Sequence, residues 1–139
     1  MKPGSFRFFI KQKKIAQDRI AATIASLDGR ILALRQRIEA NERRIAALTS
    51  ATHRTIFELQ NAHAAMKELR KENATISEQI DELQKRVIER KKELAAIHAE
   101  KKALEKLQEK ERKKRRHQQT EMENRLANES FVHKLLYHK

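Results

Sequence analysis

An apolar heptad repeat that keeps one register over most of the chain limits most strongly how this protein can fold. Heptad positions follow one another at alternating steps of four and three from Ile20 to Leu104, and most of them hold an apolar residue. An average spacing of about 3.5 residues keeps one stripe of an α-helix facing a partner helix along its whole length. The chain is therefore predicted to be all-α and to form a coiled coil, and its function is expected to depend on what that coiled coil binds.

Composition argues against a compact enzyme. The 139 residues include two glycines, one proline, no cysteine and no tryptophan, so turn residues and large aromatic core residues are scarce. No nucleophile, acid and base can be recognised as a set, there is no glycine-rich phosphate loop, and the six histidines lack the spacing of metal ligands. We expect no enzymatic activity, no cofactor, no small-molecule ligand and no metal site.

The chain is strongly basic. Charged residues make up 37% of it and the formal net charge is +13, which favours an acidic partner: nucleic acid, an anionic membrane surface or an acidic protein face. No apolar run approaches the roughly twenty residues of a membrane-spanning helix, and the first ten residues are too short and too mixed for a signal peptide. We expect a soluble, cytoplasmic protein with no transmembrane segment.

A hydroxyl-rich segment interrupts the repeat near its middle. Residues 49–55 contain three threonines and a serine. Two of them, Thr52 and Thr55, occupy heptad positions where large apolar side chains would be expected. Thr55 and Glu58 have the spacing of a capping box that starts a new helix. The sequence therefore predicts one coiled-coil domain over residues 1–139, an antiparallel hairpin with helices at about 5–49 and 55–136 and a turn at about 49–55.

Charges beside the apolar stripe favour this hairpin over a parallel dimer. If Ile24 is an a position, the g positions are arginine in the first half and include glutamate in the second: Arg30, Arg37 and Arg44 against Glu58, Glu72, Glu93 and Glu100. A parallel homodimer would instead pair like charges across its g and e positions. Exposed ion pairs contribute only about 0.2–1 kcal/mol each, so they select the topology without supplying most of the stability.

Two registers of the hairpin differ by one heptad. If Asn41 and Asn73 share a layer, facing residue numbers sum to 114, and Lys13 falls near Lys101. A turn centred near Thr52 and His53 gives a sum near 107. We favour 107, because a turn centred for the other register would fall inside the new helix after its cap.

Either register brings the N-terminal aromatic residues to the level of Ile97 and Leu104. This cluster, which includes Phe6, Phe8 and Phe9, is interpreted as a hydrophobic plug for the open end of the hairpin, with a partner-binding patch as the alternative.

No apolar residue occurs from Gln108 to Glu121, so the second helix is expected to extend past the start of the first as a solvated C-terminal overhang. The run from Lys110 to Arg116 is almost purely charged. A looser apolar stripe follows and has nothing of its own to pack against: Met122, Leu126, Val132, Leu135 and Leu136.

Both ends of the sequence resemble the FliJ/YscO family, the central stalk proteins of flagellar and virulence type III secretion ATPases. The opening FRFFIKQKKIAQDRIAATIASL is similar to the family's start, an aromatic cluster leading into a basic and then alanine-rich helix. The closing ALEKLQEKERKKRRHQQTEMENRLANESF is similar to its charged C-terminal helix.

The resemblance implies a central stalk whose termini enter a hexameric export ATPase, promote its assembly or turnover, and link it to the export gate membrane protein, with secretion chaperones as further partners. The protein would be cytoplasmic and peripheral at the inner-membrane secretion apparatus. Carried onto this chain, the partner-binding residues would be Phe6, Phe8, Phe9, Arg112, Lys113, Lys114, Arg115, Arg116, Met122 and Leu126. The exposed hairpin face and its turn would contact the gate or chaperones.

Two other functions fit the residues themselves. A basic coiled coil associated with nucleic acid or the ribosome would use the charged run to neutralise phosphates, although that run has no interleaved aromatic residues for base stacking. A generic dimeric scaffold would use the heptad repeat between chains.

Overall fold

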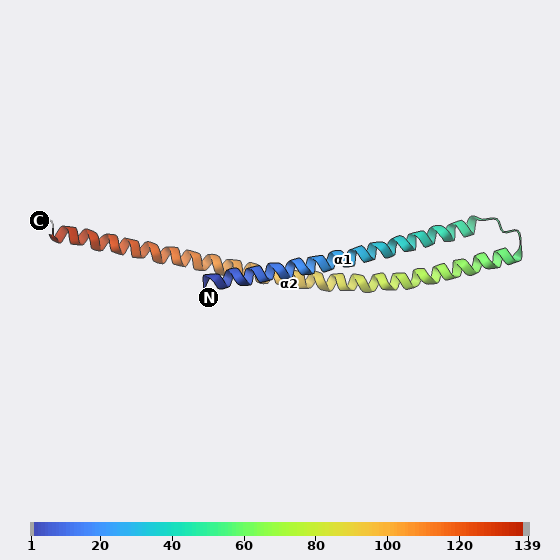
Figure 1. Ribbon diagram of the computed structural model, residues 1–139, viewed down its shortest axis with the longest axis horizontal. Helices are drawn as coiled ribbons and strands as arrows, with labels where there is room; N and C mark the ends of the chain where they lie inside the picture. Colours follow the sequence, from blue (N-terminus) through green and yellow to red (C-terminus); the bar gives the residue numbers. More distant parts are fainter. Residues whose placement is uncertain (1, 138–139) are drawn as a thin grey trace. The chain divides into compact units, whose positions relative to one another are not determined.

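The computed structural model describes residues 2–137, which form two helices (Figure 1). Helix α1 spans Pro3–Ser50 and helix α2 spans Ile56–Tyr137. The two long helices pack against each other, and the described residues contain no strand, which confirms the predicted helical hairpin. Each helix contributes to two compact units: a central unit, Gln17–Ala96, and a terminal unit, Met1–Ala16 with Ile97–Lys139.

The core of the central unit is a row of aliphatic side chains from both helices. Its buried residues come from predicted heptad positions, as do the half-buried residues packed against them, Ile24, Leu34 and Ile38. The buried members of this cluster are Leu27 and Ile31 of α1 with Ile76, Ile80, Leu83 and Val87 of α2. Outside the cluster, Ile20, Ala62 and Met66 are also buried. Burying such a side chain contributes roughly 1.5–3 kcal/mol, so this row supplies most of the stability of the pairing.

A hydrogen bond between two asparagines fixes the register. The Nδ2 atom of Asn41 donates to the Oδ1 atom of Asn73 at 2.9 Å, which gives facing residues that sum to 114. The favoured sum of 107 is therefore wrong. That register would place Asn41 opposite Met66 and Asn73 opposite Leu34, leaving two half-buried amides without partners at a cost of about 1–3 kcal/mol each.

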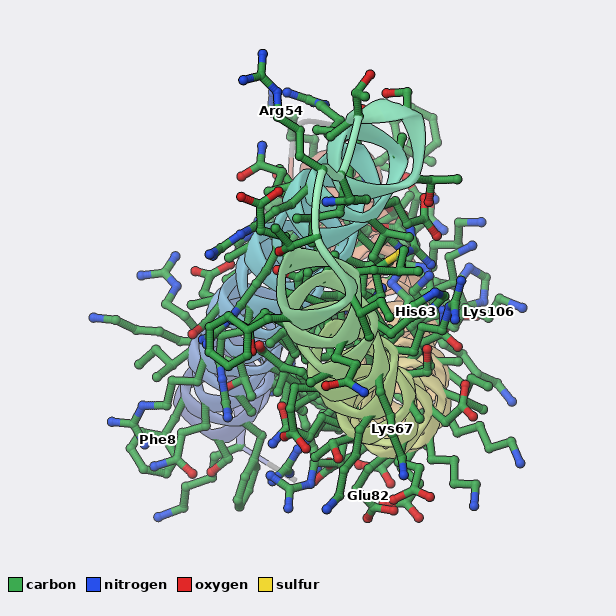
Figure 2. The ribbon with its side chains drawn as sticks, turned by 90° about the vertical axis from the view of Figure 1, so that its right-hand side faces the viewer. Phe8, Arg54, His63, Lys67, Glu82 and Lys106 are labelled. Atoms are coloured by element: carbon green, nitrogen blue, oxygen red, sulfur yellow. The ribbon has the colours of Figure 1, made fainter. Side chains whose placement is uncertain are left out.

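One of the predicted contacts between oppositely charged g positions forms in the central unit. The guanidinium of Arg37 lies 2.6 Å from the Oε1 atom of Glu72. That oxygen is buried and has no hydrogen bond of good geometry, so the contact is an ion pair without aligned donors. Lys67 and Glu82, in contrast, point away from α1 on the outer side of α2 (Figure 2).

Side chains close the last turn of α1. The hydroxyls of Thr49 and Ser50 donate to the carbonyls of Ile45 and Ala46, at 2.8 and 2.9 Å. The Nε2 atom of His53 lies 3.2 Å from the carbonyl oxygen of Leu48. The backbone N–H of Ala51 still donates to the carbonyl of Ala47 at 3.1 Å, so the Ile45 and Ala46 carbonyls lie inside the helical pattern and the hydroxyls only add bonds to them. The Leu48 carbonyl lies beyond this last backbone acceptor, and the His53 ring contacts it there.

The predicted cap starts α2. The backbone N–H of Glu58 donates to the Oγ1 atom of Thr55 at 3.1 Å, as expected for a capping box. The Glu58 carboxylate accepts from the N–H of Arg54 at 2.9 Å, one residue earlier than in the standard pattern. The Arg54 side chain points outward from the turn (Figure 2).

The first turn of α2 carries an exposed apolar cluster, which we call the tip cluster: Ile56, Phe57 and Leu59. Ile56 is 76% exposed and Phe57 is 71% exposed. In the observed register, Leu59 lies opposite Thr55, a residue of the turn itself, so no side chain of α1 is available to cover it. Leu59 was predicted to follow the apolar stripe, but its side chain is exposed because α1 has already ended.

In the terminal unit, α2 continues past the first residue of α1. The amine of Lys13 pairs with the carboxylate of Glu100, which keeps Lys13 compatible with the nearby Lys101. Figure 1 shows this part of α2 extending beyond the start of α1. Every described residue from Arg112 to Tyr137 is exposed. At about 1.5 Å per residue this segment extends roughly 40 Å, and it confirms the predicted C-terminal overhang.

Candidate partner-binding surfaces

The structure separates the three N-terminal phenylalanines into two groups. Phe6 is only 4% exposed and lines a small groove with Gln108, Glu111 and Arg112 of α2. The plug interpretation describes Phe6 well, because its ring is covered within the terminal unit. A partner could contact Phe6 only after displacing it from these neighbours.

Phe8 and Phe9 lie outside that plug. Their rings form an edge-to-face pair with centroids 5.5 Å apart, and Phe8 is 55% exposed. Phe9 also borders an open apolar groove formed by Ala103, Leu104 and Leu107. Two exposed aromatic rings beside aliphatic side chains offer a surface suited to a partner's apolar residues.

The basic run is open to solvent. All five of its predicted binding residues are exposed, and within the described part of the chain none of them forms an ion pair: Arg112, Lys113, Lys114, Arg115 and Arg116. Arg112 and Arg115 lie beside Arg7 of α1 along a shared groove. Positive charge from both helices is therefore concentrated where α1 begins.

Beyond the run, the predicted residues Met122 and Leu126 are exposed on the overhang. Local contacts support the helix here: Nε2 of His117 lies 3.0 Å from Oε1 of Glu121, and the Thr120 hydroxyl donates to the carbonyl of Arg116 at 2.9 Å. The structure thus places all ten predicted binding residues in the terminal unit, with Phe6 covered and the other nine exposed.

Two exposed apolar groups lie outside the ten residues named in the prediction. One is the tip cluster, and the other adds Phe131 and Tyr137 to the apolar residues near the end of α2. Ile56 and Phe57 occupy heptad positions e and f. Apolar residues outside positions a and d do not face the partner helix, so their presence in the sequence could have indicated an exposed binding surface.

Among residues 2–137, no three acidic or histidine side chains come together in a way that could hold a metal ion. Neither helix, over its described length, has an apolar stretch able to cross a bilayer.

Comparison with models of protein families identifies the family of this chain. The model of the flagellar FliJ protein family matches residues 1–135. The chain belongs to the FliJ family. Comparisons with curated proteins and with solved structures gave no match.

Membership agrees with the resemblance drawn from the two ends of the sequence. Membership makes this chain a component of a flagellar-type export apparatus. The assignment favours the stalk function over a nucleic-acid-associated coiled coil or a generic scaffold. It also agrees with a repeat whose core positions are filled within one chain.

Proposed function

We propose that this FliJ protein is the central stalk of a hexameric export ATPase, with its terminal unit inserted into the opening of the ring. The observation that supports this role is the overhang of α2, where Lys113 to Arg116 form no ion pair within the described residues and the apolar side chains of Met122 and Leu126 are exposed. A ring lined by acidic and apolar groups would complement both. Binding would promote ring assembly or turnover.

A stalk without catalytic residues alters ATP hydrolysis only by binding some states of the ring subunits more tightly than others. Cations surround the overhang at Lys113, Lys114, Arg115 and Arg116, whereas Met122 and Leu126 lie further along the helix. One helix inside six similar subunits would present a different side to each of them. Different contacts around the ring would favour different nucleotide states.

The tip cluster provides a second contact surface in this proposal. Ile56 and Phe57 are exposed beside a turn whose backbone is fixed by the Thr55 and Glu58 cap. Exposed apolar residues on a rigid support suit recognition by another protein. We assign the export gate or a secretion chaperone to this end, and a cytoplasmic, peripheral position at the inner-membrane apparatus to the whole chain.

Deletion of the residues after Gln108 tests the ring-facing assignment. We expect the truncated protein to remain helical, because the core lies in the central unit, and to lose stimulation of the ATPase. ATPase rate with purified ring subunits is the measurement, and circular dichroism checks folding. A full-length double variant, Met122→Ser with Leu126→Ser, is expected to reduce stimulation in the same direction.

The matched control changes the tip cluster instead. Ile56→Ser with Phe57→Ser also replaces two exposed apolar residues, and it should preserve ATPase stimulation while weakening capture of the gate protein. Unchanged stimulation after the deletion would contradict insertion of the overhang into the ring.

A further inference from the structure

Charge is distributed very unevenly between the two units. The terminal unit contains 17 basic and 7 acidic residues, whereas the central unit contains 15 basic and 12 acidic residues. The terminal unit therefore carries +10 of the net charge of +13. Residues 1–16 contribute five basic residues and no acidic one.

The cations of both helices meet in this unit. Arg7 and Lys11 of α1 line an open groove with Lys101 and Arg112 of α2, and Glu105 is its one acidic lining residue. The adjoining groove places Arg7 with Arg112 and Arg115, beside Glu111. Since Lys113 to Arg116 form no ion pair in the described chain, this positive surface is available to an anionic partner.

A group of exposed apolar side chains lies on the same helix, about 15 to 21 residues beyond the basic run. We call this group the apolar end, and it consists of five residues: Phe131, Val132, Leu135, Leu136 and Tyr137. At about 1.5 Å per residue it is roughly 20–30 Å from the run. Between them lie Glu121, Glu123 and Glu129 with Arg125, so attraction to an anion comes from the run.

We propose that the terminal unit binds the surface of an anionic lipid bilayer, with the basic run against the headgroups and the apolar end in the interfacial layer. A polybasic segment near a bilayer gains about 1 kcal/mol per Lys or Arg, and exposed apolar and aromatic side chains add interfacial anchoring. Nucleic acid fits less well, because the run has no aromatic residue for stacking and the apolar end has no role on a phosphate backbone.

This binding goes beyond the proposed stalk function and uses overlapping residues. An overhang enclosed by an ATPase ring cannot lie on a bilayer at the same time. Anionic vesicles and ring subunits should therefore compete for the protein. Vesicle binding itself is measured without the ATPase, so either proposal can fail while the other holds.

Co-sedimentation of the full chain with vesicles tests the proposal. We expect binding to an equimolar mixture of phosphatidylcholine and phosphatidylglycerol, little binding to phosphatidylcholine alone, and weaker binding as salt rises. Replacing Lys113, Lys114, Arg115 and Arg116 by Gln should lower partitioning about thirtyfold or more, which corresponds to half of these cations facing the bilayer at about 1 kcal/mol each. Leu135→Ser with Leu136→Ser should also lower it, by about tenfold.

A control variant removes the same charge from the central unit. It replaces four exposed basic residues by Gln: Arg30, Arg35, Arg70 and Arg86. Its partitioning should change by less than about threefold, because the lost charges lie in the unit of low net charge. An equal loss in both quadruple variants, equal binding to neutral vesicles, or tighter binding to random duplex DNA that is insensitive to the Leu135 and Leu136 changes would overturn the proposal.

Discussion

The central and terminal units are made from the same two helices, yet they use the coiled-coil pattern differently. The central unit buries a continuous row of aliphatic residues and has nearly balanced charge. Among the described residues of the terminal unit, Phe6 alone is buried, and most of the chain's excess positive charge is found there. The difference indicates that one region stabilises the hairpin while the other leaves its side chains available to partners.

The largest expected effect tests whether stability really resides in the central unit. Leu83→Ala removes a side chain that is 4% exposed and should lower the free energy of unfolding by about 2–5 kcal/mol. Leu126→Ala makes the same chemical change at a residue that is 59% exposed, and it should change stability by less than about 0.5 kcal/mol. Urea unfolding followed by circular dichroism measures both.

Complete loss of structure in Leu83→Ala would still agree with this difference, because a two-helix hairpin has little stability to spare. A similar loss in both variants would break the comparison, since it would mean that the overhang packs against part of the chain.

A smaller effect is expected at the polar layer of the central unit. Asn41→Leu leaves the Asn73 amide without its 2.9 Å hydrogen bond and should lower the free energy of unfolding by about 1–2 kcal/mol. Replacing both asparagines by Leu should recover stability but weaken the specification of register. Unfolding measures the first effect and cysteine crosslinking measures the second.

The chain has no native cysteine, so crosslinks are easy to interpret. Cysteines at Ile38 and Ile76 report the observed register, and cysteines at Ile38 and Leu69 report the register shifted by one heptad. The first pair should crosslink in the otherwise unchanged chain, and the second should gain yield only when both asparagines are Leu. Efficient crosslinking of the second pair with Asn41 and Asn73 present would contradict the observed register.

The smallest effects on stability are expected from the ion pairs between the helices, a feature that both units share. Each contains an ion pair between helices: Arg37 with Glu72 in the central unit and Lys13 with Glu100 in the terminal unit. Double-mutant cycles with Gln replacements should give coupling energies of about 0.2–1 kcal/mol for both pairs, falling as salt rises. Coupling well above this range in one unit would show that its charges contribute specifically to the pairing.

The hairpin itself could be predicted from the sequence, because its signals are local. The heptad positions identify the core residues, and Thr55 and Glu58 identify the start of α2. Register depends on a competition between distant residues. The prediction gave weight to the position of the turn, whereas the pairing of Asn41 with Asn73 outweighs it and leaves Leu59 exposed beyond the end of α1.

The candidate site was only partly accessible to sequence reasoning. Phe6, Phe8 and Phe9 are close in the sequence, so they could be placed at one level of the hairpin. The heptad pattern could not show that one ring is covered while two are exposed, because this depends on side-chain neighbours such as Gln108 and Glu111. The basic run was easier to interpret. A charged segment without apolar residues cannot be part of a core, so its exposure follows from composition alone.

Tyr137 is the one tyrosine in a chain without tryptophan, and it lies at the described end of the overhang with its ring 4.5 Å from that of His133. Its intrinsic fluorescence therefore reports almost exclusively on the environment of this segment. Binding to the ATPase ring and binding to a bilayer should each change the emission of this tyrosine in an unlabelled sample. The emission of the free protein is the reference for both changes.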